Sequence, residues 1–179
     1  MAHLLLVFLH VTSAMGIVAG LGIEGWALVQ FRASRTMSDA RVALGSTRHV
    51  QRFMGLSMLT AIVTGMYLAT AYWRWQGAWM GVALLTIVIM AIVGGFMTGR
   101  PTARVLRTVG EPRAEEIAAV QRVLSLSYVI RLGLFLGIVF LMTTKPASGA
   151  IALLVVVIAA ASGILGGLPA RRVRARASA

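Results

Sequence analysis

Five long apolar runs, separated by short polar segments, dominate the pattern of this chain. Each run has about the 20 residues that a helix needs to cross roughly 30 Å of hydrocarbon. The sequence therefore predicts an all-α, polytopic membrane protein in which residues 1–179 form one helical-bundle domain. The five predicted transmembrane helices are Leu4–Phe31, Phe53–Trp73, Gly77–Met97, Val123–Thr143 and Ala147–Leu168.

The first apolar run differs from a secretory signal peptide. It lacks a basic start, it is too long, and it has no small-x-small cleavage site before a polar stretch. We expect it to stay in the mature protein as the first transmembrane helix.

Arginine is concentrated in alternate connections, whereas the other connections hold only Arg74 and Lys145. The positive-inside rule then places the N-terminus outside and the C-terminus, with a basic tail at 169–179, in the cytoplasm. We expect this membrane to be the cytoplasmic membrane of a bacterium. The arginines on the predicted cytoplasmic side are Arg32, Arg35, Arg41, Arg48, Arg52, Arg100, Arg104, Arg107, Arg113, Arg122, Arg171, Arg172, Arg174 and Arg176.

The connections predict which helices are neighbours. Trp73–Gly77 and Thr144–Pro146 are short enough to be tight turns, so the second and third helices, and the fourth and fifth, are expected to form adjacent antiparallel pairs. Residues 100–121 are expected to form a cytoplasmic loop. Within it, the fourth helix is expected to begin near Pro112, because carboxylates follow in what would be its first turn.

Composition supports the membrane class and narrows the chemistry. Hydrophobic residues make up 59% of the chain, and its formal net charge is +12. Because the arginines lie in short loops between apolar runs, they indicate contacts with anionic lipid headgroups and do not indicate nucleic acid. The chain has no cysteine, which excludes disulfides and thiolate metal sites.

Small residues recur at helical spacing in several runs, for example at Gly16 and Gly20, Gly133 and Gly137. Such faces let helix backbones approach closely in lipid. We interpret them as packing faces within one bundle, with a homo-oligomer or a contact with another membrane protein as the alternative.

Glu24 and Arg131 are the two formal charges deep inside the apolar runs. Helical rise places them about 10 Å and 12 Å from the same predicted side, so an ion pair between them is geometrically allowed. A charge in the bilayer core costs at least about 2.5–3.5 kcal/mol. The pair is interpreted as a structural clamp between helices, with a proton or anion pathway as the functional alternative.

His10 is the other candidate site residue, and Met66 lies at a similar predicted depth in the second helix. Imidazole and thioether together suit haem iron or copper(I). The competing interpretation is a histidine that is hydrogen-bonded to a neighbouring helix, with methionine as an apolar filler. His49 is about 30 Å away along the bundle, so a bis-histidine haem is not expected within one chain.

A family resemblance can be stated for about the first hundred residues. Leu9–Gly20 (LHVTSAMGIVAG) and Arg52–Leu68, which ends in VTGMYL, resemble the first two helices of an uncharacterised family of small integral membrane proteins. They are also similar, more distantly, to the CopD copper-resistance membrane domain and to HemJ-type protoporphyrinogen oxidases. HemJ-type enzymes pair the histidine of the first helix with a lysine in the third. Here Ala83 lies in the corresponding stretch, and the only lysine is Lys145.

These observations lead to three functional hypotheses. The first is a non-enzymatic subunit or scaffold of a membrane complex, since no catalytic motif was recognised. The second is a haem- or copper-binding protein that uses His10. The third is a transporter of a small ion or substrate, which the apparent lack of broken helices and inverted repeats disfavours.

Overall fold

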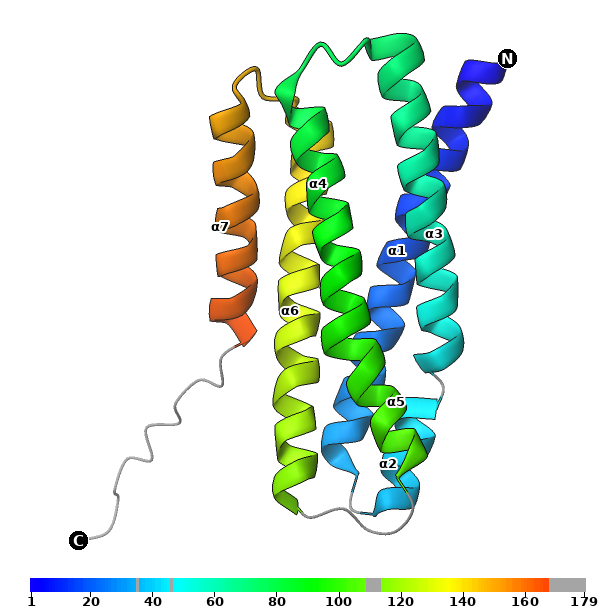
Figure 1. Ribbon diagram of the computed structural model, residues 1–179, viewed down its shortest axis with the longest axis vertical. Coiled ribbons are helices and arrows are strands. Elements are labelled where there is room, and N and C mark those ends of the chain that lie inside the picture. The colour runs from blue at the N-terminus through cyan, green and yellow to red at the C-terminus, as the bar shows by residue number, and fades with distance from the viewer. Residues whose placement is uncertain (35, 46, 109–113, 168–179) are drawn as a thin grey trace, which may run out of the picture.

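The structure is a computed structural model that describes residues 1–34, 36–45, 47–108 and 114–167. The regular elements of these ranges are all helical, which confirms the predicted all-α class (Figure 1). They comprise α1 (Ala2–Ala33), α2 (Met37–Gly45), α3 (Thr47–Leu68), η1 (Ala69–Trp73), α4 (Ala78–Val93), η2 (Gly94–Gly99), α5 (Arg100–Arg107), α6 (Ala114–Thr144) and α7 (Gly149–Gly167).

The outer surface of the bundle is apolar along most of its length. Four helical stretches in the described residues are long and apolar enough to cross a membrane, and α7 is a shorter apolar helix. Leucine, valine, isoleucine and phenylalanine side chains are exposed on all five long helices. Soluble monomers rarely expose contiguous apolar patches of more than a few hundred Å². The fold is therefore compatible with a bundle that lies in a bilayer.

The two ends of the bundle differ in charge. Figure 1 places the N-terminus, the α3–α4 connection and the α6–α7 connection at one end. The opposite end, called the basic end here, is formed by α2 and α5, which carry Arg41, Arg100, Arg104 and Arg107. This separation agrees with the predicted sidedness, although the orientation itself stays a prediction. The predicted tail at 169–179 lies outside the described residues.

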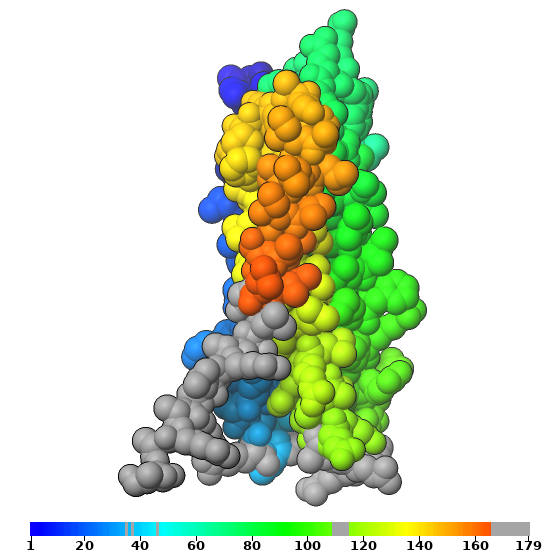
Figure 2. Space-filling model, turned by 90° about the vertical axis from the view of Figure 1, so that its left-hand side faces the viewer, coloured from blue at the N-terminus to red at the C-terminus, as the bar shows by residue number. Residues whose placement is uncertain are grey.

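Glycines allow the backbones of α6 and α7 to approach closely. A Cβ atom added to Gly133 would meet the carbonyl oxygen of Ala159, and one added to Gly163 would meet that of Val129. Figure 2 shows α7 lying along α6, with α4 beside them. On the other side of the bundle, α1 packs closely against α3. The small-residue faces of α1, α6 and α7 therefore serve contacts within the chain.

The predicted pairing of helices is confirmed only in part. Although α6 and α7 form the expected antiparallel pair, α3 packs mainly against α1, and α4 packs mainly against α6. The short connection at Trp73–Gly77 joins α3 to α4 at one end, but it does not force them into contact along their length. Their separation leaves an open groove between them.

The boundaries also differ from the predicted ones at the basic end. The third apolar helix was expected to end at Met97, whereas its path continues without a turn through η2 and α5 to Arg107. The connection expected to be a loop also contains the first residues of α6, which begins at Ala114; Pro112 lies outside the described residues. A short helix, α2, was not predicted, and Leu44 and Ala40 bury its apolar face against α1 and α6.

Candidate functional site

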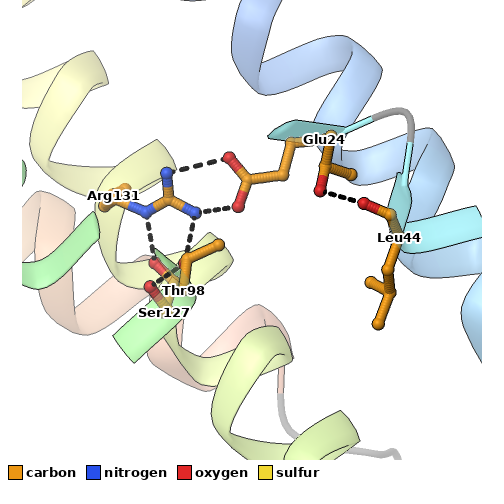
Figure 3. A network of polar contacts seen from close by, with 6 residues as sticks. Glu24, Leu44, Thr98, Ser127 and Arg131 are labelled. Atoms are coloured by element: carbon orange, nitrogen blue, oxygen red, sulfur yellow. Dashed lines mark hydrogen bonds and ion pairs between the residues drawn. The ribbon is translucent and has the colours of Figure 1, made fainter. Parts of the chain in front are cut away.

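The centre of the site is an ion pair between α1 and α6. The guanidinium of Arg131 binds the carboxylate of Glu24 in a bidentate arrangement, in which Nη1 donates to Oε2 at 2.9 Å and Nη2 donates to Oε1 (Figure 3). Arg131 is fully buried, and Glu24 is 6% exposed. The structure thus brings together the two charges that the sequence placed at matching depths.

Two further residues hold the guanidinium in place. Arg131 Nη2 also donates to Thr98 Oγ1 at 3.0 Å, and Nε donates to the backbone carbonyl of Ser127 at 3.3 Å. The hydroxyls of Thr98 and Ser127 lie 2.8 Å apart and share a hydrogen bond. All three guanidinium nitrogens therefore have acceptors within the chain, and the network joins α1, η2 and α6.

The π-helical stretch η2 helps to bring Thr98 to this network. A π turn closes with i→i+5 bonds and holds more residues than an α turn, so it changes which side chains face the bundle interior. Gly94 lies beside the guanidinium, where an added Cβ would be 3.4 Å from Arg131 Cδ. Thr98 and Thr102, four and eight residues later, are both buried. One face of this helix thus supplies both the space for Arg131 and an acceptor for it.

Burial of this pair is tolerated because each charge meets its opposite in good geometry. A buried charge without a partner costs several kcal/mol, and a bidentate arginine–carboxylate pair with extra hydrogen bonds offsets much of that cost. A buried pair is weak evidence for net stability, so we interpret this one as fixing which helix faces meet. Its arrangement here fits a clamp among three helices.

A small cavity lies beside Glu24. Its volume is about 10 Å³, which is close to the minimum needed for one water molecule. Glu24, Thr47, Thr98, Thr102 and Tyr128 contribute its polar lining, with Leu28, Leu44 and Leu124. The hydroxyl of Thr47 donates to the carbonyl of Leu44, which ties α3 to α2 at this point. The α2 helix therefore helps to close the polar centre at the basic end.

His10 lies away from this centre, at the α1–α3 contact. Its Nδ1 is 3.1 Å from the carbonyl oxygen of Ala61 and 3.1 Å from Thr64 Oγ1. Since a carbonyl oxygen only accepts, Nδ1 carries the hydrogen in the bond to Ala61, and this tautomer leaves the lone pair on Nε2. The ring also packs against Gly65, where an added Cβ would lie 3.0 Å from Cε1.

The structure does not show a ligand set around His10. Its hydrogen bonds go to Ala61 and Thr64 of α3 and not to Met66 of the same helix, a residue that is 45% exposed. In the part of the chain that the structure describes, no three histidine, cysteine, aspartate or glutamate side chains are grouped so that they could hold a metal ion. The contacts fit the interpretation in which His10 bonds to a neighbouring helix.

Sequence reasoning missed two residues of the site, Thr98 and Thr47. Thr98 follows directly after the predicted end of the third helix at Met97 and precedes the loop expected at 100–121, so neither prediction included it. The signal that could have pointed to it is its place as a hydroxyl residue among Gly94, Gly95 and Gly99. Tyr128 lies one turn before Arg131, and its hydroxyl packs against Gly25.

Comparisons with known proteins give no family for the chain. No model of a known protein family, no curated protein and no solved structure matches it. The resemblance to the uncharacterised family and to the CopD and HemJ-type proteins therefore stays a prediction from short motifs in the first two helices.

Proposed function

We propose that this protein is a non-enzymatic membrane subunit or scaffold, a helical bundle of fixed shape that presents its outer faces to other membrane proteins. The observation that supports the proposal most strongly is the internal clamp. The guanidinium nitrogens of Arg131 and both carboxylate oxygens of Glu24 are bonded to groups of the same chain. Charges used in this way hold the bundle in one arrangement, which a scaffold requires.

The proposal includes a location and an orientation. We propose the cytoplasmic membrane of a bacterium, with the basic end in the cytoplasm and the N-terminus outside. The separation of α2 and α5 from the connections that contain Arg74 and Lys145 supports this orientation. Anionic headgroups would meet the arginines at the basic end.

Site-specific photo-cross-linking in cells tests the scaffold role. A cross-linking residue is placed singly at one exposed position on each of four helices: Val18 on α1, Leu56 on α3, Leu85 on α4 and Leu154 on α7. A scaffold should give an adduct with the same protein from one or two neighbouring faces and none from the others. Adducts with lipid alone from all four positions, together with a monomer in mild detergent, would overturn the proposal.

Single cysteines test the orientation, because the chain has no native cysteine to react. Ser148→Cys lies in the α6–α7 connection, and Ser38→Cys lies in α2; both positions are exposed. A membrane-impermeant maleimide should label Ser148→Cys in intact cells and should label Ser38→Cys only after lysis. The reverse pattern would mean that the basic end faces outward.

A haem- or copper-binding protein is the second candidate function. The bond from His10 Nδ1 to the carbonyl of Ala61 favours it, because ligating histidines commonly donate their other ring nitrogen in this way. The resemblance of the first two helices to CopD and HemJ-type proteins adds to it. Nε2 of His10 would be the ligand.

Visible absorption and elemental analysis of the purified protein decide this candidate. Haem would give a Soret band that disappears in His10→Ala and persists in His3→Ala, the matched control from the same helix. Bound copper would likewise be absent from His10→Ala and present in His3→Ala. A colourless, copper-free wild type, after growth with both supplied, would refute the candidate and leave the scaffold proposal intact.

A further inference from the structure

A groove lies on the surface between α3 and the α4–η2 helix. It has a volume of about 590 Å³, within the range of about 300–1,000 Å³ for ligand pockets. Arg100 is its one charged lining residue, and Gly95 lines it with no atom within 4 Å of where a Cβ would be. The lining residues that matter for the argument are Ile62, Val88, Ile92, Gly95, Phe96 and Arg100.

The length of the groove matches one leaflet of a bilayer. Val88 and Arg100 are twelve residues apart on a continuous helical path, which corresponds to about 18 Å of rise. Half the thickness of a typical hydrocarbon core is about 15 Å. With Arg100 at the headgroup level of the basic end, the apolar part of the groove reaches roughly to the bilayer centre.

Arg100 is held ready to bind an anion. Its guanidinium carbon lies 4.0 Å from the centre of the Phe96 ring, a cation–π contact that orients the guanidinium plane. Among the described residues, its nitrogens have no hydrogen-bond acceptor. Guanidinium groups bind phosphate oxygens through two parallel hydrogen bonds.

We propose that this groove binds one anionic phospholipid of the leaflet at the basic end. One acyl chain lies along Ile62, Val88 and Ile92, and the phosphate accepts hydrogen bonds from Arg100. The inference requires the helices to cross a bilayer, but it does not depend on the scaffold role.

A protein helix fits the groove less well than an acyl chain does. A helix about 10 Å wide and 18 Å long occupies roughly 1,400 Å³ as a cylinder, more than twice the volume of the groove. Because Gly95 has no side chain, the groove is deeper at that one position. A local depression of this kind can hold a flexible acyl chain. Arg100 then favours a lipid with a net negative charge, because the phosphate of a zwitterionic lipid is already paired in part with the cation of its own headgroup.

Native mass spectrometry of the purified full-length chain tests the proposal. The protein is mixed with equal amounts of phosphatidylglycerol and phosphatidylcholine that carry the same acyl chains. We expect one phosphatidylglycerol to be retained at least about tenfold more strongly than phosphatidylcholine, as for one charge-assisted contact. Arg100→Gln should remove this preference, whereas Arg104→Gln, an exposed arginine of α5, should keep it.

Filling the groove gives a test that leaves the charge in place. Gly95→Leu should weaken retention of both lipids by about tenfold, while Gly81→Leu should not, although its Cβ position on α4 is equally open. Circular dichroism and gel filtration show that each variant is folded. Equal retention of the two lipids by the wild type, or equal losses in a variant and its control, would overturn the proposal. So would a cross-linker at Val88 that captures a protein segment in place of lipid.

Discussion

Replacing Glu24 by glutamine leaves Arg131 fully buried without its counterion. A guanidinium cannot lose its proton in a protein, so the charge stays inside the bundle. Removing one partner of a buried pair typically costs about 3–5 kcal/mol. Because the new amide, Thr98 and the Ser127 carbonyl still accept hydrogen bonds from Arg131, we expect a loss near the lower end, about 3 kcal/mol.

The reciprocal change should cost less. Arg131→Gln leaves behind a carboxyl group, which, unlike a guanidinium, is not a permanently charged group. The residual cost is that of a buried polar group with imperfect partners, about 1–3 kcal/mol. We therefore also predict that Arg131→Gln is more stable than Glu24→Gln.

The double variant, Glu24→Gln with Arg131→Gln, has no buried charge. If the two residues acted independently, their losses would add to about 5 kcal/mol. Because they form one pair, we expect the double variant to be no less stable than Glu24→Gln alone, which gives a coupling energy of about 2 kcal/mol or more. The swap Glu24→Arg with Arg131→Glu should recover part of the stability, since the charges still pair but their hydrogen-bond partners do not match.

Unfolding by SDS in mixed micelles, followed by tryptophan fluorescence, gives the required free energies. Glu115→Gln makes the same chemical change at an exposed position of α6 and should stay within about 0.5 kcal/mol of wild type. Additive losses in the cycle would refute the clamp. Each charge would then be stabilised separately, and a pathway through the bundle would become the better explanation.

Three further changes test the packing and the network. Gly133→Ala should cost about 1–3 kcal/mol in unfolding free energy, because the new Cβ meets the Ala159 carbonyl and backbone cannot yield; Gly22→Ala, in open space, should be neutral within about 0.5 kcal/mol. Thr98→Val should cost about 1–3 kcal/mol, since Arg131 loses a buried acceptor; an unchanged midpoint would show that the bond is dispensable. Arg131→Lys should be less stable than wild type but more stable than Glu24→Gln when the midpoints are compared, because it keeps the charge and loses the bidentate geometry.

The sequence by itself determined the helices. Hydropathy and length are local properties of the chain, and backbone groups in hydrocarbon must be hydrogen-bonded within a helix, so Leu4–Phe31 and Val123–Thr143 fall inside α1 and α6. The depth of Glu24 and of Arg131 followed from the same count of residues. The number of predicted transmembrane helices also placed Arg74 and Lys145 in connections at the end of the bundle opposite α2 and α5.

Only the tertiary structure decided which faces meet. The rotation of each helix about its axis depends on packing, and many side chains of similar size suit an apolar face. For this reason no pattern in the sequence indicated that α3 would pack on α1 and leave a groove beside α4. The π-helical register of η2 likewise arises from packing, and it brings Thr98 to Arg131. The position of a side chain along the helix axis follows from its residue number. The direction in which it points around that axis depends on how the helix packs against its neighbours.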